Sequence, residues 1–186
     1  VSPAPIRPTP SWTFWPKHPK LMEQVRSKGL LSWEERSISS IFIGSYTTNL
    51  RGTHDWGSAI QKYYMGPHSA RILNPESYLR ALGSSKFGLC LPGVGPKCLR
   101  DIELIGMGTV PVFTPGVSTD YYSPLIEGVH YLYADTPEGV DKAIRGCSES
   151  KWKEMSAACR SWYEDNCSPH GSFKLTQRII QENTQK

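Results

Sequence analysis

The segment FGLCLPGVGPKCLRDIELIGMGTVPVF, residues 87–113, decides the fold of this chain. It begins with an apolar run typical of a buried strand, residues 87–91, which a loop with two prolines and two glycines interrupts sharply. A second apolar run, residues 109–113, has the composition of another strand. The segment therefore predicts a strand, a loop, a short helix opening near Lys97 and a second strand.

The predicted helix rests on the spacing of its apolar residues, which are Leu99, Ile102 and Ile105. The same spacing places Lys97, Arg100 and Glu103 together on another face of the first turns. Gly106 and Gly108 then close the helix. We therefore expect two cations and one carboxylate to line the mouth of the loop.

This loop and helix start have the features of a phosphate site. Gly93 and Gly95 let backbone N–H groups approach a ligand without interference from a Cβ atom. A helix N-terminus offers unpaired N–H groups and a positive dipole end, so a diphosphate is favoured there, and Lys97 and Arg100 would add charge-assisted hydrogen bonds. Glu103, one turn deeper, would accept hydrogen bonds from both hydroxyls of a ribose.

A purely structural role stays open for each of these side chains. Arg100 and Glu103, three residues apart, can form an exposed ion pair worth about 0.2–0.5 kcal/mol. We favour the binding role because both residues follow directly after the double-glycine loop. A lysine near a helix start is unfavourable for the helix dipole unless an anion is present, so Lys97 fits either interpretation.

The stretch SKFGLCLPGVGPKCLRDIELIGMGTVPVF resembles the C-terminal, nucleotide-sugar-binding half of exostosin-like glycosyltransferases of the GT-B fold. That family shows SKF, an apolar strand, a Pro/Gly loop, an Arg followed three residues later by Glu, small residues and a Pro-Val pair. Upstream, SIFIGSYTTNLRG, residues 40–52, is similar to the first strand, glycine turn and Arg-Gly of the same half. The resemblance covers the central third to half of the chain.

The resemblance implies roles for particular residues. Arg100 and Lys97 would bind the diphosphate and stabilise it as the leaving group, and Glu103 would bind the ribose. The facing loop would contact the phosphate or the sugar through Gly44, Ser45 and Arg51, with His54 as a further candidate. Cys98 and Leu99 stand where many relatives carry an aromatic residue or Ser-Tyr, so the identity of the donor stays open.

The predicted function is transfer of a hexosyl or pentosyl group from a nucleoside diphosphate sugar to a glycan or another hydroxyl acceptor. We expect no metal or other cofactor, because Asp-x-Asp, which holds a divalent ion in the other major transferase fold, does not occur. The expected partners are the nucleotide sugar, a glycan acceptor, and an upstream α/β domain or partner subunit that would supply the catalytic base.

Two other classes of function stay open. The domain can be a non-catalytic module that binds a nucleotide or glycan, or an assembly partner of a catalytic subunit that docks through the aromatic segment at residues 12–15. A Walker P-loop, a G-x-S-x-G elbow and a complete G-x-G-x-x-G do not occur, which argues against nucleotide hydrolysis, ester hydrolysis and nicotinamide binding.

Composition and patterning predict one α/β domain preceded by an irregular arm. With 186 residues and 38% hydrophobic content, the chain suits a single core. Six prolines among the first twenty residues make residues 1–35 an arm or linker with one short helix, and residues 36–186 the nucleotide-sugar-binding domain. A net charge of +4, carried by scattered side chains, does not call for nucleic acid, and no apolar run is long enough to cross a membrane.

Strand and helix patterns alternate through this domain. The expected strands are residues 40–46, 70–73, 87–91, 109–113 and 129–133, and the expected helices outside the opening segment are residues 54–65, 75–82, 137–145, 150–164 and 172–182. This alternation predicts a doubly wound, mostly parallel, Rossmann-like sheet with ligands at its carboxyl edge, and the chain ends in helices. The resemblance implies the same architecture, that of a GT-B C-terminal domain.

The five cysteines are odd in number and contain no C-x-x-C pair, so we expect reduced, mostly buried thiols and a cytoplasmic setting. The resemblance to exostosin-like enzymes, which work in the Golgi lumen, leaves that compartment and a disulfide between Cys159 and Cys167 open. His68, His130 and His170 have no partner at metal or catalytic-triad spacing, so we expect surface or strand roles for them.

Overall fold

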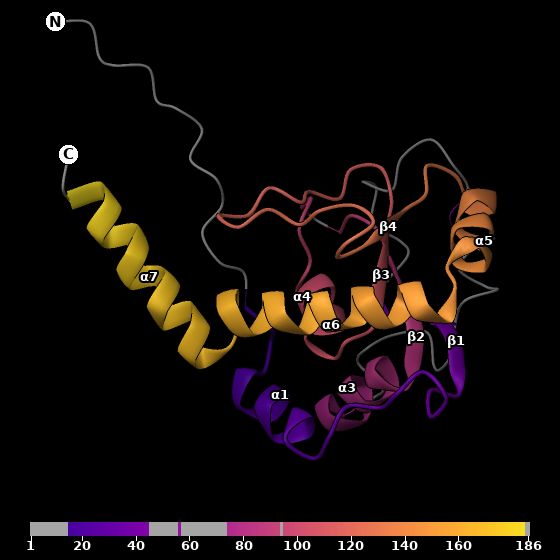
Figure 1. The fold of residues 1–186 in the computed structure, drawn as a ribbon, viewed down its shortest axis with the longest axis horizontal. Helices are drawn as coiled ribbons and strands as arrows, with labels where there is room; N and C mark the ends of the chain where they lie inside the picture. The colour runs from indigo at the N-terminus through magenta and orange to yellow at the C-terminus, as the bar shows by residue number, and fades with distance from the viewer. Residues whose placement is uncertain (1–14, 45–55, 57–73, 94, 185–186) are drawn as a thin grey trace, which may run out of the picture.

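The computed structural model describes residues 15–44, 56, 74–93 and 95–184. In these ranges it is a parallel sheet of four strands with helices packed around it (Figure 1). In order across the sheet, the strands are β1 (Ile38–Ile41), β2 (Ser85–Cys90), β3 (Val110–Phe113) and β4 (Leu132–Tyr133). Each neighbouring pair is parallel, which confirms the expected α/β class.

The helices begin at capping signals that are visible in the sequence. They are α1 (Pro19–Arg26), α3 (Pro75–Gly83), α4 (Leu99–Gly106), α5 (Pro137–Gly146), α6 (Glu149–Asn166) and α7 (Pro169–Thr184). The Asn74 side chain accepts from the Ser77 N–H at 2.8 Å at the start of α3, and Thr136 caps α5 in the same way. The expected helices 75–82, 137–145, 150–164 and 172–182 are confirmed, with ends shifted by a few residues. The helix expected at 54–65, apart from helical Trp56, and the strand at 70–73 lie outside the described residues.

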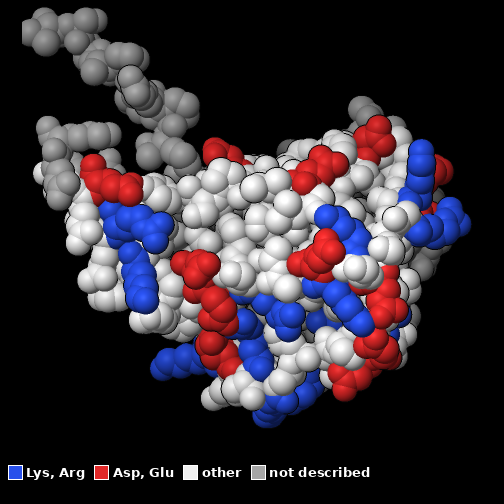
Figure 2. Space-filling view, viewed as in Figure 1, with Lys and Arg blue, Asp and Glu red and all other residues white. Residues whose placement is uncertain are grey.

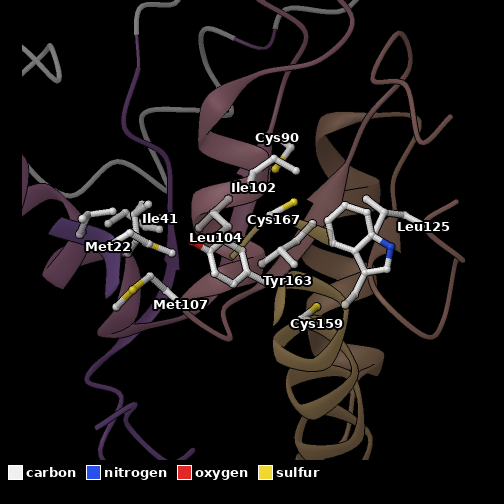
Figure 3. Close-up of a cluster of buried hydrophobic side chains, with 14 of the residues drawn as sticks. Met22, Ile41, Cys90, Ile102, Leu104, Met107, Leu125, Cys159, Tyr163 and Cys167 are labelled. Atoms are coloured by element: carbon white, nitrogen blue, oxygen red, sulfur yellow. The ribbon is translucent and has the colours of Figure 1, made fainter. Parts of the chain in front are cut away.

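Alternation along the strands divides the interior into two cores. Ile41, Cys90 and Phe113 belong to the first core, and Phe42, Leu89 and Val112 belong to the second. The first core also receives residues of α1, α3, α4 and the second half of α6, and Figure 3 shows its labelled Met22, Leu104 and Tyr163. The second core is filled from α5 and the first half of α6. Helices therefore cover both faces of the sheet.

Helix α1 joins the body although it falls within residues 1–35. Its Met22 and Val25 are part of the first core, and the Arg26 Nε donates to the carbonyl of Gly106 at 2.8 Å. A Cβ atom at Gly106 would lie 2.4 Å from the end of the Met22 side chain and 2.7 Å from the Tyr163 ring, so glycine lets α4 lie close to both side chains. The segment before α1 is thereby held near α4.

The last predicted strand is shorter than expected. Residues 129–133 were expected to be extended, but β4 contains only Leu132 and Tyr133. The preceding residues form a turn in which His130 Nδ1 accepts from the Ile126 N–H at 3.0 Å and Gly128 has a φ of 72°. Turn chemistry therefore overrides the strand propensity of the apolar residues there.

The amino edge of the sheet is closed by buried, fully bonded side chains. Helix α6 crosses this edge, where Trp152 Nε1 donates to the Lys86 carbonyl at 2.6 Å and the Ser156 hydroxyl donates to the Gly108 carbonyl at 2.7 Å. Arg36, 3% exposed, lies beside them. Its guanidinium donates to four acceptors, the carbonyls of Leu31, Ser85 and Met107 and the hydroxyl of Thr109. Burial lowers the pKa of Arg36 to about 10.

Charges of both signs alternate over the face seen in Figure 2, without a large field of one sign. No helix within the described ranges is long and apolar enough to span a membrane. All five cysteines lie in those ranges and none is in a disulfide. Burial raises the pKa of the Cys159 thiol to about 12, and this thiol donates to the His130 carbonyl.

Candidate functional site

The candidate site lies at the carboxyl edge, where the chain leaves β1 and β2. Arg100, in the first turn of α4, lies across the ends of both strands. Its Nη1 donates to the Ile43 carbonyl at 3.3 Å, and its Nη2 donates to the Leu91 carbonyl at 3.1 Å. The guanidinium carbon is 4.6 Å from the centre of the Phe42 ring. A cation is therefore held at the edge where parallel α/β sheets bind ligands.

Gly44 gives this guanidinium its space. A Cβ atom at position 44 would lie 2.5 Å from Arg100 Nη1, a distance that side chains do not tolerate. The structure thus brings together two of the predicted site residues, Gly44 and Arg100. The Ile43 carbonyl, next to Gly44, accepts from Arg100 although the two residues are 57 positions apart in the sequence. Ser45, Arg51 and His54, predicted for the same facing loop, lie outside the described residues.

Hydrogen-bonding capacity is left over at this edge. Arg100 Nε, Asp101 Oδ1 and Tyr121 Oη are buried atoms with no hydrogen-bond partner within the described part of the chain. Asp101 is 1% exposed, and burial raises its pKa even though Arg100 acts in the opposite direction. Burial alone would lower the pKa of Arg100, but the neighbouring Asp101 raises it, so Arg100 stays cationic. Buried polar atoms normally have partners, and their absence here indicates a place for a ligand or water.

A cavity of about 160 Å³ adjoins Arg100. Its lining consists of Lys17, His18, Pro75, Tyr78, Leu79, Leu99, Arg100 and Glu103. Glu103 is 3% exposed, and both of its carboxylate oxygens accept hydrogen bonds from the protein. Oε2 accepts from the Tyr78 hydroxyl at 2.8 Å, and Oε1 accepts from the Lys17 backbone N–H at 2.9 Å. Arg100 and Glu103 therefore share one cavity, with the carboxylate already engaged.

Lys97 does not join them, which corrects the predicted face of three charged side chains. Helix α4 begins at Leu99, after Cys98, because the Asp101 carboxylate accepts from the Cys98 N–H at 3.0 Å and so caps the helix there. Lys97 consequently precedes the helix, where its ammonium donates to the Asp120 carbonyl and lies 4.3 Å from the centre of the Tyr121 ring. Desolvation by burial lowers the pKa of Lys97.

The predicted apolar face of the helix needs a second correction. Ile102 and Ile105 are buried as expected, but Leu99 is 39% exposed because it is the first residue of the helix and lines the cavity. Asp101 and Glu103 are buried in its place. Periodicity alone therefore assigned the wrong residue of the first turn to the core.

The glycines of the loop are not required by backbone conformation. Neither Gly93 nor Gly95 has a positive φ, and the Gly93 N–H donates to the Gly95 carbonyl at 3.0 Å. A Cβ atom at Gly95 would meet nothing within 4 Å, and one at Gly93 would lie 3.0 Å from Cys98 Sγ. The structure thus gives no steric reason for glycine at position 95, and the phosphate contact of this loop stays a prediction.

Two solved structures resemble this fold. The crystal structure of a glycosyltransferase from Rickettsia africae ESF-5 matches 88% of this chain and 52% of its own, with 11% identity and a TM-score of 0.51. The two chains share a fold. The C-terminal domain of a glycosyl transferase group 1 family protein (LpcC) from Francisella tularensis matches 82% of this chain and 94% of its own, with 9% identity and a TM-score of 0.48.

This chain spans about half the length of the Rickettsia protein, 52%. At 11% identity, the likeness to that glycosyltransferase is one of fold. No protein-family model matches the sequence, and no curated protein matches it. The exostosin-like resemblance therefore stays a hypothesis based on the quoted motifs.

Sequence reasoning missed Tyr78, His18 and the Lys17 backbone. Tyr78 is 25 residues from Glu103 in sequence and Lys17 is 86 residues away, and neither position belongs to a motif. The one local signal that was overlooked is Asp101, an acidic residue at the third position of a helix, which is typical of a capping interaction. Within the described ranges, no three His, Cys, Asp or Glu side chains lie close enough to hold a metal ion.

Proposed function

We propose that this domain binds a nucleoside diphosphate sugar at the carboxyl edge of its sheet and serves as the donor half of a GT-B glycosyltransferase of the exostosin-like type. One observation carries the proposal. The Arg100 guanidinium lies across the ends of β1 and β2, its Nε has no hydrogen-bond partner among the residues that the structure describes, and the adjoining cavity also contains Glu103. A fixed guanidinium with a free donor is suited to a phosphate oxygen.

In this proposal each part of the edge has a separate task. Arg100 neutralises the diphosphate, and the N-terminus of α4 adds backbone N–H donors and the positive end of its dipole. These groups also stabilise the negative charge that develops on the diphosphate when the bond to the sugar breaks. Lys97 donates to the Asp120 carbonyl, so it can bind the same phosphates only by leaving that carbonyl.

Transfer requires an acceptor hydroxyl aligned with the anomeric carbon of the sugar. We propose that the acceptor, a glycan or another hydroxyl compound, is bound by a further α/β domain or a partner subunit, which also supplies the catalytic base. The donor is a hexosyl or pentosyl nucleotide. Arg100 and the α4 terminus take the role that a divalent cation has in metal-dependent transferases, so we propose that binding is metal-independent.

Calorimetry with UDP, GDP, ADP, CDP and their sugar conjugates tests the donor site. We expect one nucleoside diphosphate to bind wild type and Arg100→Ala to bind it about tenfold or more weakly, because a hydrogen bond to a charged group contributes about 1.5–3 kcal/mol. Arg145→Ala, at the exposed end of α5, is the matched control and should bind like wild type. Equal affinities of wild type and Arg100→Ala would contradict the assignment.

Two further measurements separate the parts of the proposal. Titrations in EDTA and in Mg²⁺ should give equal affinities, whereas a requirement for Mg²⁺ would contradict metal independence. Transfer or slow donor hydrolysis by a protein that includes the neighbouring domain would distinguish an enzyme from a non-catalytic nucleotide-binding module.

A role as an assembly partner is the second candidate, and one observation favours it. Trp15, four residues before the start of α1, is 49% exposed, although leaving a large aromatic ring in water is costly. Loss of partner binding in Trp15→Ala, together with no affinity of wild type for any nucleoside diphosphate, would support this role over the donor site.

A further inference from the structure

The two hydrogen bonds to Glu103 differ in the rigidity of their donors. The first donor is the hydroxyl of Tyr78 on α3, a helix whose Leu79 and Leu82 are in the first core. The second is the backbone N–H of Lys17, which belongs to the segment before α1 and forms one wall of the cavity. Tyr78 therefore holds Oε2 from the body of the domain, and Lys17 holds Oε1 from a segment at its surface.

Tyr78 is suited to be a permanent donor. Its ring packs against the first core, and burial followed by the nearby Glu103 raises the pKa of its hydroxyl well above the usual value. The hydroxyl consequently stays protonated over the whole working pH range and can only donate to the carboxylate. A side chain with this environment sets the orientation of Glu103 and is not itself exchanged for a ligand.

The Lys17 N–H is the donor that a ligand can replace. Trp15 and Lys17 are exposed, and only Pro16 between them is buried. Helix α1 begins at Pro19, and the side chain of its N-cap, His18, makes no capping hydrogen bond. A hydroxyl group that enters the cavity can take the position of the Lys17 N–H at Oε1 while the Tyr78 bond to Oε2 remains.

We propose that Tyr78 is a positioning residue that presents Glu103 Oε1 to one ribose hydroxyl of the bound nucleotide, and that the Lys17 N–H occupies this oxygen until the nucleotide binds. This inference rests on the proposed donor site. It replaces the expectation that Glu103 accepts from both ribose hydroxyls, because Oε2 is committed to Tyr78. The Trp15–His18 segment then moves or relaxes whenever the site is filled.

Two variants with opposite expected effects test this inference. The probes are the tightest binder among UDP, GDP, ADP and CDP and its 2′,3′-dideoxy counterpart, measured by calorimetry on the whole chain. Tyr78→Phe keeps the ring and loses the hydroxyl, so affinity for the ribonucleotide should fall about fivefold to tenfold while affinity for the dideoxynucleotide stays the same. Tyr133→Phe, at an exposed position of β4, is the matched control and should change neither affinity.

Lys17→Pro removes the competing N–H donor and leaves Tyr78 in place. It should raise affinity for the ribonucleotide about twofold to fivefold and leave affinity for the dideoxynucleotide unchanged. The reason is that the ribose hydroxyl no longer has to displace the Lys17 N–H from Glu103 Oε1. Where Tyr78→Phe fails to fold, which its thermal unfolding curve reports, the Lys17→Pro result decides alone.

Each remaining outcome contradicts a defined statement. Equal losses for both nucleotides in Tyr78→Phe, or no loss, would overturn the positioning role. Equal binding of the ribo and dideoxy forms by wild type would overturn the role of Glu103 and leave the diphosphate site with Arg100 intact. No binding of any nucleoside diphosphate by wild type would overturn the proposed function together with this inference.

Discussion

Each edge of the sheet contains an arginine, Arg36 at the amino edge and Arg100 at the carboxyl edge. The two guanidinium groups differ in their hydrogen bonding. At the amino edge, every nitrogen of the Arg36 guanidinium donates to an acceptor of the protein, and α6 crosses over it. At the carboxyl edge, Arg100 binds two strand-end carbonyls, and its Nε has no partner in the described part of the chain. A fully bonded cation stabilises the fold, whereas a cation with a spare donor can bind a ligand.

The same contrast extends to the neighbours of each arginine. The Thr109 hydroxyl beside Arg36 is also bonded, since it donates to the Leu82 carbonyl at 2.6 Å. Beside Arg100, Asp101 Oδ1 and Tyr121 Oη have no partner among the described residues. Among the described residues, the three buried polar atoms without a partner therefore belong to Arg100, Asp101 and Tyr121, and none belongs to the amino edge.

The largest effect that separates the two edges is expected for Arg36→Ala. It removes four hydrogen bonds, takes the Arg36 donor from the buried Met107 carbonyl and leaves the Ser85 carbonyl with the Thr109 hydroxyl at 3.1 Å, so the free energy of unfolding should fall by about 3–5 kcal/mol. Urea unfolding followed by circular dichroism measures the loss. Arg100→Ala should cost less than half as much, and similar costs for both variants would abolish the distinction between the edges.

A smaller effect is expected for Gly44→Ala, which acts on Arg100 from the facing loop. The new Cβ atom would lie 2.5 Å from Arg100 Nη1 and must displace the guanidinium, so nucleoside diphosphate affinity should fall about threefold to tenfold. The matched control is Gly146→Ala at the end of α5, where an added Cβ atom meets nothing within 4 Å. Calorimetry in which both variants bind like wild type would show that Arg100 has no ligand role in this position.

The smallest effect is expected for Asp101→Asn and concerns pH. Burial raises the folded-state pKa of Asp101 above its unfolded value, so the folded protein favours the protonated acid, and stability falls as pH rises through the folded-state pKa. Asparagine cannot ionise and lacks this decline. The unfolding free energy of the variant relative to wild type should therefore increase between about pH 4 and pH 7, by about 1 kcal/mol or less.

Urea unfolding at several pH values measures this difference, with exposed Asp135→Asn as the control. A relative stability of Asp101→Asn that decreases with rising pH would show that the electrostatic attraction of Arg100 outweighs burial. In that case Asp101 would engage Arg100 strongly, and the difference between the two edges would be smaller than we infer.

Much of the fold could be predicted because its signals are local. Asn74 caps α3 and Thr136 caps α5 through side chains that bind N–H groups three residues away, and continuous apolar runs mark β2 and β3. Periodicity alone predicts the wrong start for α4, because the cap that Asp101 forms with Cys98 begins the helix at Leu99. That error moved Lys97 into the site and Leu99 into the core.

The candidate site could be predicted only in part. Arg100 and Glu103 were recognised because they follow a Pro/Gly loop at helical spacing, which depends on neighbours in the chain. The contacts that define their chemistry come from the packing of distant segments: Gly44 against Arg100, and Tyr78 and Lys17 on Glu103. Helix and strand patterns arise from repeated short-range geometry, so they are visible in sequence. Hydrogen bonds between elements depend on how helices lie on the sheet, and the folded structure alone decides them.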